Sequence, residues 1–390
     1  MRRRLKTAIF YAALPLIAGV AIEAPLRLIG YLWTKVPHAR PPHTKWHSEN
    51  EIWGVWHQPN ARVRNAEQCF DVTYSANEFG MRDKPRRLEK TKPRIAVLGD
   101  SFTEGWGVDD GRNFTSILEN EHFGGKIEVL NFGTSGVFGT TQEWLLYKQL
   151  ARRFKPDLVV VAFLNNDVSD NSWPVWKTRD PCRRRPYLIK NEGGGFDLFY
   201  PPACIAGRAS PFLEDGTESF LESHSFLARL IGETLHRSRS VEPADFSGIF
   251  GDRPTDAWRK DWETTLQAFL RLKAEVAADG SKLMIVNLVD AAQMDPESAP
   301  YPERGKDMDV LAVNKRLETF AKTNGIEYFS LYPYFKDYRD RRRLKSPYFS
   351  LSCDDHWSEL GHRTAAAALA EYLRGRFGRA LKIRHPGRIR

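Results

Sequence analysis

Cysteine is scarce in this sequence: there are four cysteines among 390 residues, and no two of them form a Cys-x-x-Cys pair. This spacing argues against a thiolate zinc site and against thioredoxin-like redox chemistry. Zinc-finger spacing, a helix-turn-helix signature and aromatic-basic repeats are also lacking, so we expect no nucleic acid as a partner. The chain carries no internal repeat and no low-complexity tract. No pattern indicates a cofactor or a metal, and we expect neither.

Long apolar runs are few as well. Four basic residues among the first six precede an apolar run from Ala8 to Ile22, and a second apolar patch ends near Trp33. A basic start followed by such a run is typical of a segment that enters a membrane from the cytoplasm. The run is shorter than the roughly 20 residues that span a bilayer. We therefore expect residues 1–33 to be a signal anchor, with a cleaved signal peptide or a helix buried in the domain as alternatives.

The formal net charge is +9, and part of the positive excess lies in the arginine runs 183–185 and 341–343. Such runs are typical of a solvated surface that keeps a protein soluble. They also suit attraction to anionic lipid headgroups or to an acidic polymer. The charge alone leaves both interpretations open.

From Arg94 onward, apolar β-branched runs alternate with helical patterns, which predicts a parallel sheet covered by helices on both faces. The expected strands are Ile95–Leu98, Ile127–Asn131, Leu158–Leu164, Leu283–Leu288 and Glu327–Leu331. The expected helices run from a Thr140/Glu143 capping box to about Phe154, from Ala257 to about Ala278, from Asp309 to Thr323, and from a Ser358 cap to about Phe377.

Three segments flank or interrupt this pattern. Residues 34–93 are rich in Pro, His, Trp and Asn without periodicity, which predicts a linker and an irregular lead-in to a domain at 94–380. Residues 172–254 carry many prolines and glycines. Because an unstructured loop of that length is uncommon, we expect an insertion that forms a small cap at the C-terminal edge of the sheet. Residues 381–390 form a basic tail.

The even number of cysteines becomes informative if the chain is exported, because disulfides persist in oxidising compartments. Cys182 and Cys204 bracket one loop-like stretch and are the pair that we favour. A bond between Cys69 and Cys353 is also possible on the sequence, with less to support it.

Four polar stretches fall where the predicted sheet would bring them together. Ligands bind in the crevice outside the carboxyl ends of parallel strands, where such stretches converge. They are Gly99-Asp100-Ser101, Asn131–Gly136 and Asn165–Asp167, each directly after a strand, and Asp354–Trp357 before the last helix.

The chemistry that these residue types suit is acyl transfer through a serine. Ser101 needs a base to take its proton, and His356 is the candidate. Asp354 is the candidate to fix the imidazole and to stabilise its charged form. The tetrahedral intermediate needs fixed donors to its oxyanion. The candidates are the backbone N–H groups of Ser101 and Gly136 and the side-chain amide of Asn166.

The four stretches resemble, in order, the four sequence blocks of the SGNH (GDSL-type) hydrolases, over residues 94–377. The resemblance implies a flavodoxin-like three-layer α/β/α fold with a central parallel sheet. To that fold this chain would add the cap-like insertion and an N-terminal membrane helix. The resemblance also implies esterase or acyltransferase chemistry, with Ser101 as nucleophile, Gly136 and Asn166 as oxyanion donors and His356 as base.

Two positions depart from the family pattern. The residue before the oxyanion asparagine is usually Gly and is Asn165 here, which puts the backbone of that loop in question. The residue three before the histidine is usually Asp and is Cys353 here. Asp354 has the two-residue spacing of the subgroup that resembles membrane-anchored polysaccharide O-acetyltransferases. We therefore expect Asp354 to orient the histidine, with Asp355 as the alternative.

Other residue types near these stretches have simpler interpretations. We expect His362 to pack or lie on the surface rather than to act as a base, and Asp167 and Asp170 to brace a loop rather than to bind a metal. Glu104 is expected to be exposed, although it can border the acyl pocket. Four tryptophans suit a sugar-stacking rim and the core equally: Trp106, Trp173, Trp176 and Trp357.

The sequence therefore predicts a serine-dependent acyl-ester hydrolase or O-acyltransferase that acts on a cell-envelope or exported glycan through an acyl-Ser101 intermediate. Its substrate would be an acylated glycan or lipid. The N-terminal helix would hold it at the inner membrane, with the catalytic domain in the periplasm. The alternatives are a lipase- or thioesterase-like hydrolase, and a non-catalytic glycan-binding component of an export machine. The departures at Asn165 and Cys353 keep the last alternative open.

Overall fold

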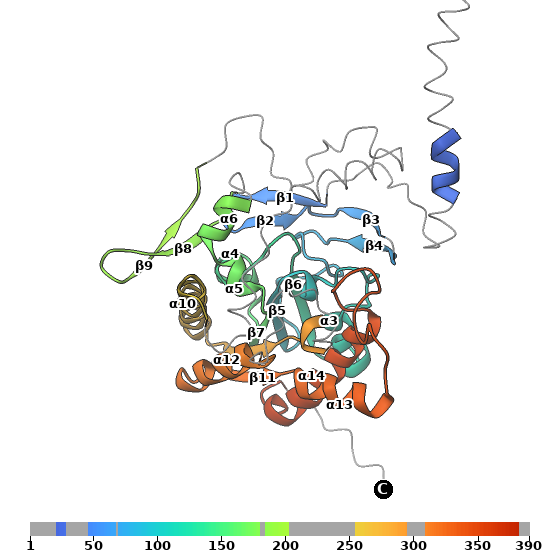
Figure 1. Cartoon of the computed structure of the whole chain (residues 1–390). Helices are drawn as coiled ribbons and strands as arrows, with labels where there is room; N and C mark the ends of the chain where they lie inside the picture. The colour runs from blue at the N-terminus through green and yellow to red at the C-terminus, as the bar shows by residue number, and fades with distance from the viewer. Residues whose placement is uncertain are drawn as a thin grey trace, which may run out of the picture.

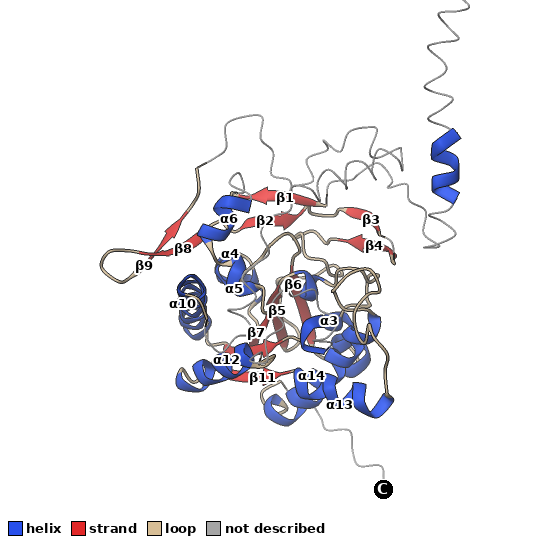
Figure 2. Ribbon diagram, in the orientation of Figure 1, coloured by secondary structure: helices blue, strands red, loops and turns tan. Residues whose placement is uncertain are grey.

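The computed structural model describes residues 21–28, 46–67, 69–179, 184–202, 254–294 and 309–381. Its centre is a sheet of five strands that lie between helices (Figures 1 and 2). Every neighbouring pair in this sheet is parallel, which confirms the predicted strands with small shifts at their ends. The strands are β5 (Arg94–Gly99), β6 (Glu128–Gly133), β7 (Leu158–Phe163), β10 (Lys282–Asn287) and β11 (Glu327–Ser330).

The order of the strands fixes where a ligand can bind. Across the sheet they are arranged β11-β10-β7-β5-β6. Numbered along the chain, this is the 2-1-3-4-5 order of flavodoxin-like folds, as expected. The chain leaves β5 and β7 toward opposite faces, so a crevice opens between the carboxyl ends of these two strands. In register, Gly99 of β5 lies beside Gly133 of β6 on one side and Ala162 of β7 on the other.

Both faces of the sheet are buried, because successive side chains of a strand point to opposite faces. In β7, Val159 and Val161 join one hydrophobic cluster, and Leu158 and Val160 join the other. The first cluster is covered by α4 (Thr140–Gln149), α10 (Asp256–Ala278) and α12 (Ala312–Thr323). The second is covered by α3 (Phe114–Ile117), α13 (Tyr332–Arg342) and α14 (Glu359–Phe377).

The starts of α10 and α14 follow the sequence, whereas α12 begins at Ala312, three residues after the expected Asp309. Thr255 caps α10 by accepting a hydrogen bond from Trp258 N, and Ser358 precedes α14 as predicted. The predicted capping box of Thr140 and Glu143 is wrong. The helix begins one residue earlier, at the N-cap Gly139, whose N–H donates to the side chain of Gln142 (3.0 Å). The helix also ends at Gln149, and Phe154 belongs to a separate 3₁₀ turn, Ala151–Phe154.

The expectation of an irregular lead-in at 34–93 is wrong for part of the described residues. Residues 47–57 and 62–75 form two antiparallel hairpins that lie along one end of the molecule in Figure 1, whereas 76–93 contain neither helix nor strand. Their strands are short and mix aromatic with polar side chains, so no period of two is visible in the sequence. The first hairpin pairs β1 (His47–Asn50) with β2 (Gly54–His57), and the second pairs β3 (Arg62–Ala66) with β4 (Asp71–Ser75).

Buried arginine contacts attach this lead-in to the sheet domain. Arg82 stacks on the ring of Tyr74, with its guanidinium carbon 3.6 Å from the ring centroid. The same guanidinium donates to the backbone carbonyls of Glu104 (3.2 Å), Gly105 (2.5 Å) and Val108 (2.5 Å). Each hydrogen bond to a charged donor contributes about 1.5–3 kcal/mol. The lead-in is therefore part of the domain core rather than a linker.

The ends and the insertion are described only in part. Of the expected insertion, the structure describes α6 (Trp173–Arg179) and a hairpin of β8 (Tyr187–Lys190) and β9 (Phe196–Phe199). Residues 180–183 and 203–253 lie outside the described residues, as do 1–20 and 29–33 of the expected anchor and all but Leu381 of the tail. Residues 21–28 are helical. In the described ranges, no helix combines the length and the apolar character needed to cross a bilayer.

His362 is a core residue, as predicted. It lies on α14, is 1% exposed, and its Nδ1 accepts the backbone N–H of Phe114 at 3.3 Å. Burial, assisted by the charges of Arg82 and His356, lowers the pKa of His362 to about 3. The residue is therefore neutral in the folded protein at neutral pH.

This buried imidazole gives the stability a pH dependence. Below about pH 6.5 the unfolded chain binds a proton at His362 that the folded chain does not, so the free energy of unfolding falls as the pH falls. Between about pH 7 and pH 5 the loss from this residue is about 2 kcal/mol. In His362→Asn, the side-chain oxygen of the asparagine can accept the N–H of Phe114 without binding a proton. We therefore expect the free energy of unfolding of this variant to fall less between pH 7 and pH 5. Denaturant titrations of the unaltered protein and of His362→Asn at pH 7 and at pH 5 measure these free energies. An equal fall in both proteins would contradict the prediction.

Candidate active site

Ser101 lies at the start of α2 (Ser101–Glu104), directly beyond the carboxyl end of β5. Asp100 caps this helix, because its Oδ1 accepts the N–H of Phe102 at 2.9 Å. Asn131 of β6 contacts the same segment, donating from Nδ2 to the backbone carbonyl of Thr103 at 2.9 Å. The serine is therefore held at the crevice that the strand order predicts.

The structure brings Ser101, His356 and Asp354 together. The Oγ of Ser101 lies 2.7 Å from Nε2 of His356, although 255 positions separate them in the sequence. Nδ1 of His356 is hydrogen-bonded to Oδ1 of Asp354. With the Nδ1 proton donated to that carboxylate, the Nε2 lone pair faces the serine hydroxyl. This geometry allows the imidazole to accept the serine proton.

Asp354, and not Asp355, contacts the histidine. Its Oδ1 also accepts the backbone N–H of His356 (2.8 Å), and its Oδ2 accepts the indole N–H of Trp106 (3.2 Å). Burial acts to raise the pKa of Asp354, but the hydrogen bonds and charge of His356 outweigh it and hold that pKa below its ordinary value. The carboxylate therefore stays ionised near neutral pH. Asp355 is exposed.

The candidate oxyanion donors follow the strands on either side of β5. Gly136 comes after β6 and has φ of +95°, a conformation that favours glycine. Asn166 comes after β7, in the loop that enters α5 (Asp167–Asp170). The amide nitrogen of Asn166 lies 3.1 Å from Oδ2 of Asp170 and 3.4 Å from Oδ2 of Asp100. The amide is thus positioned by two carboxyl groups.

The unusual Asn165 has a partner of its own. Its side-chain amide donates to Oδ2 of Asp290 at 2.7 Å, which links the loop after β7 to the loop after the neighbouring strand β10. Burial raises the pKa of Asp290 to about 6, against the opposing effect of its hydrogen bonds. The asparagine therefore replaces the flexibility of a glycine with a side-chain link between two strand ends.

A group of buried carboxyl groups behind Asn166 was not expected from the sequence. Burial raises the pKa of Asp100 to about 6, and raises the pKa values of Glu143 and Asp167 well above their ordinary range. Asp167 braces its loop, as predicted, because its Oδ2 accepts the N–H of Leu164 at 3.0 Å. Glu143 sits on α4, and its burial could not be read from a helix whose apolar stripe is weak. The raised pKa values reflect the cost of placing these charges in the core, because burial disfavours the ionised form of a carboxyl group.

The loop that carries His356 is fixed at several points. The N–H of Leu351 donates to the carbonyl of His356 (2.8 Å), and the indole of Trp357 donates to the carbonyl of Val289 (2.8 Å). A disulfide joins Cys353 to Cys69, with Cα atoms 5.6 Å apart. The pair that the sequence favoured less is therefore present, and the favoured Cys182–Cys204 pair lies outside the described residues.

Glu104 is not exposed, contrary to expectation: its exposed fraction is 0%. Its carboxylate accepts from Trp46 of the lead-in (2.8 Å), a partner that no local sequence pattern reveals. Among the tryptophans, Trp357 and Trp176 are buried. Trp173 packs on Tyr187 and Phe199 of the insertion. Only Trp106 among these four contacts the candidate site, with its ring centroid 5.8 Å from that of His356.

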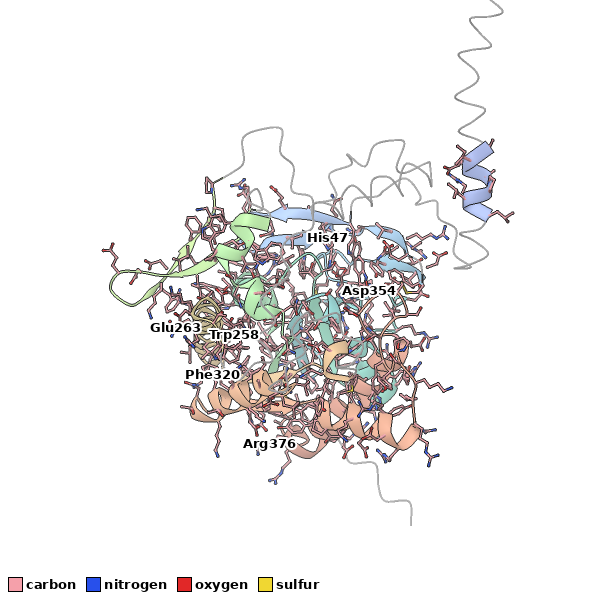
Figure 3. The ribbon with its side chains drawn as sticks, viewed as in Figure 1. His47, Trp258, Glu263, Phe320, Asp354 and Arg376 are labelled. Atoms are coloured by element: carbon pink, nitrogen blue, oxygen red, sulfur yellow. A yellow bond between two sulfur atoms is a disulfide. The ribbon has the colours of Figure 1, made fainter. Side chains whose placement is uncertain are left out.

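A pocket of about 330 Å³ opens beside the candidate triad on the Asp354 side. It lies between the loop after β10 and the segment 346–355. Figure 3 labels Asp354, which lies toward the end of the molecule that holds β1–β4, whereas Arg376 lies toward the opposite end. Space for a bound molecule therefore adjoins the carboxylate of Asp354.

Comparison with known families gives a match over residues 252–385, to the family described as SGNH hydrolase-like domain, acetyltransferase AlgX. The matched segment includes Asp354 and His356 and begins after Ser101. A search of curated proteins finds no match.

Solved structures with a similar chain course include a putative lipolytic protein of the G-D-S-L family from Desulfitobacterium hafniense, 11% identical with a TM-score of 0.36, covering 72% of this chain and 99% of that one. Another is an acetylxylan esterase, Axe2, from Geobacillus stearothermophilus, 12% identical with a TM-score of 0.37, covering 74% of this chain and 95% of that one.

The disulfide gives a test of how the histidine loop is held. Cys69→Ser/Cys353→Ser removes a cross-link between residues 284 positions apart, and we expect the free energy of unfolding to fall by up to about 5 kcal/mol. Non-reducing peptide mapping of the unaltered protein should recover the Cys69 and Cys353 peptides as one species. The free energy of unfolding of Cys182→Ser/Cys204→Ser, which leaves Cys69 and Cys353 in place, serves as the comparison. Separate peptides, or unchanged unfolding, would show that the bond does not form.

Proposed function

We propose that the chain is a serine-dependent acyl-ester hydrolase or O-acyltransferase of the SGNH type, which works through an acyl-Ser101 intermediate. The contact of 2.7 Å between Ser101 Oγ and His356 Nε2, with Asp354 on the other ring nitrogen, is the observation that carries this proposal. A hydroxyl, an imidazole and a carboxylate in this sequence of contacts form the arrangement that activates a serine for attack on an acyl carbon.

The proposed reaction begins when Ser101 Oγ attacks the acyl carbon and its proton passes to Nε2 of His356. The carbonyl oxygen becomes an oxyanion, which the backbone N–H groups of Ser101 and Gly136 and the amide of Asn166 stabilise. Collapse of the intermediate releases the alcohol, which takes the proton back from His356. Water or an acceptor hydroxyl then attacks the acyl-serine by the same steps, so the acceptor decides between hydrolysis and transfer.

For the substrate, we propose an O-acylated glycan of the cell envelope or an exported glycan, with acetyl as the acyl group. The description of the matched family as an acetyltransferase supports this choice. The Cys69–Cys353 disulfide favours an oxidising compartment, and the basic start followed by an apolar run favours an anchored, periplasmic domain.

Mass spectrometry of the intact protein after incubation with p-nitrophenyl acetate tests the intermediate. We expect a mass increase of one acetyl group, located on Ser101, and none in Ser101→Ala. Adding an acceptor oligosaccharide should speed the loss of the adduct if the enzyme transfers the acyl group. A folded Ser101→Ala protein with an undiminished rate would eliminate the mechanism. A preference for long-chain esters over acetate esters would favour the lipase-like alternative. Failure of a fluorophosphonate probe to label Ser101 would favour the non-catalytic alternative.

Asp354 and Asp355 form a matched pair of variants for the role of the carboxylate. Asp354→Asn leaves the histidine loop in place but favours the wrong tautomer, so kcat should fall by about 10⁴-fold. Asp355→Asn should change kcat by less than about threefold, because its side chain is exposed. Steady-state rates with the same acetyl ester measure both effects. Equal losses in the two variants would show that Asp354 does not orient His356.

A further inference from the structure

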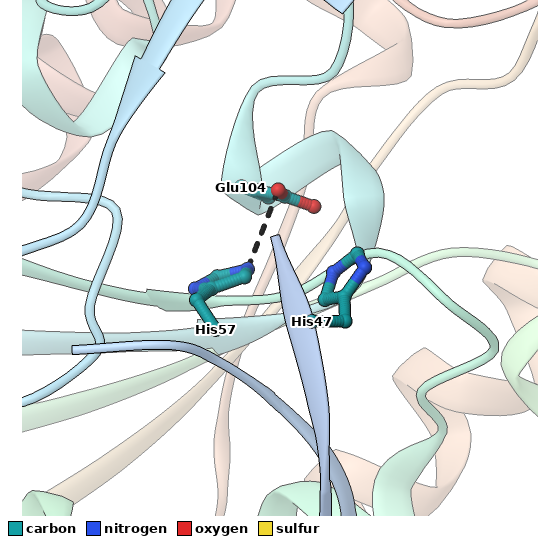
Figure 4. Close-up of side chains that lie close together, drawn as sticks. All are labelled: His47, His57 and Glu104. Atoms are coloured by element: carbon teal, nitrogen blue, oxygen red, sulfur yellow. Dashed lines mark ion pairs between the residues drawn. The ribbon is translucent and has the colours of Figure 1, made fainter. Parts of the chain in front are cut away.

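A second cluster of polar side chains lies next to the candidate active site, where β1 and β2 meet α2. It consists of His47, His57 and Glu104 (Figure 4). One ligand atom from each, an imidazole nitrogen or a carboxylate oxygen, can be chosen so that all lie within 4.8 Å of one another. The side chains of His57 and Glu104 are 0% exposed, and His47 is partly buried. Outside this cluster, the described ranges contain no other such group of three.

The orientation of His57 leaves its inner nitrogen facing the carboxylate. Its Nδ1 lies 2.8 Å from the backbone carbonyl of Gly80, and a carbonyl only accepts, so Nδ1 carries a proton. Its Nε2 lies at ion-pair distance from Oε1 of Glu104, 3.3 Å, and makes no hydrogen bond to another described residue. A neutral ring would therefore direct a lone pair at a carboxylate. Either a second proton or a cation is needed between them.

The contacts around the cluster are those that hold metal ligands in place. A ligating histidine commonly donates its other N–H to a backbone carbonyl, as His57 does to Gly80. The carboxylate of Glu104 is oriented by the indole N–H of Trp46 on Oε1 and by the backbone N–H of Ser135 on Oε2. Carboxylate oxygens accept more than one contact each, so both can still face a cation.

The separation of His57 and Glu104 fits a tetrahedral ion. Ligands bound at about 2.0–2.1 Å with tetrahedral angles lie about 3.4 Å apart, and the observed separation of Nε2 and Oε1 is 3.3 Å. His47 is the most exposed ligand of the three. Its Nε2 lies 3.2 Å from Oγ of Ser135, which marks a polar fourth position. Two imidazoles and one carboxylate form a donor set that zinc accepts.

We propose that His47, His57 and Glu104 bind a zinc ion, with the fourth position beside Ser135. The ion fastens β1 and β2 to α2, three residues after Ser101, and to the loop that leads to Gly136. Its role is to hold these segments, not to touch the substrate. A sequence search for metal spacing could not find this site, because its ligands come from three separate elements and include no cysteine.

Metal binding is tested directly on the untagged, full-length protein after treatment with EDTA and dialysis. We expect the protein to retain about one zinc per chain after equilibration with Zn²⁺ and gel filtration, measured by mass spectrometry of the metal. Co²⁺ in place of Zn²⁺ should give the visible absorption of a tetrahedral site. His47→Ala should weaken zinc binding by at least about tenfold, and zinc should raise the melting temperature of the unaltered protein more than that of the variant.

His122→Ala is the matched control, because it removes a histidine far from the cluster in sequence and should bind zinc like the unaltered protein. If the unaltered protein retains no zinc and gives no cobalt absorption, the two buried side chains form a proton-linked ion pair and the proposal is overturned. Equal zinc affinity in His47→Ala would also overturn it. The measurement on the unaltered protein decides the question even if the variant fails to fold. None of these readouts depends on ester turnover.

Discussion

The site depends on how closely α2 approaches the ends of β5 and β6. Gly99 and Gly133 are paired in register at those ends. A Cβ at Gly99 would overlap the side chain of Thr103, and a Cβ at Gly133 would overlap the backbone between Thr103 and Glu104. Only glycine at both positions allows the short helix to sit on the strand ends. Because Ser101 is its first residue, this contact sets the position of the hydroxyl and of the backbone N–H beside it.

The other half of the candidate triad reaches the serine through the core. His356 lies in a loop, but the next residue, Trp357, is 1% exposed and packs among aromatic side chains such as Phe102 and Phe335. Phe102 also packs under the His356 ring, with centroids 4.8 Å apart. Side chains that contact both partners therefore couple the two loops. The disulfide at Cys353 adds a covalent link from the same loop to the lead-in.

The sequence predicted those features that depend on local periodicity or on order along the chain. The core strands were found because both their faces are apolar. Ser101 was singled out because it follows a strand, and His356 and Asp354 because they precede the last helix, supply the base and carboxylate that a serine needs, and resemble the last block of the SGNH family. The lead-in hairpins were missed because their strands are short and carry polar side chains. The burial of Glu104 was missed because its partners, Trp46 and His57, lie far away in the sequence. The carboxyl of Glu143 was missed because α4 is buried on its polar side as well.

The buried carboxyl groups bear on how Asn166 can serve an oxyanion. Its amide has two N–H groups, and their two contacts differ in length, 3.1 Å to Asp170 and 3.4 Å to Asp100. The longer bond is the weaker one. Because burial raises the pKa of Asp100 to about 6, its carboxyl gains an O–H donor under mildly acidic conditions. The contact with Asp170 is therefore the firmer hold on the amide that we propose as an oxyanion donor, and the contact with Asp100 is the one that protonation alters.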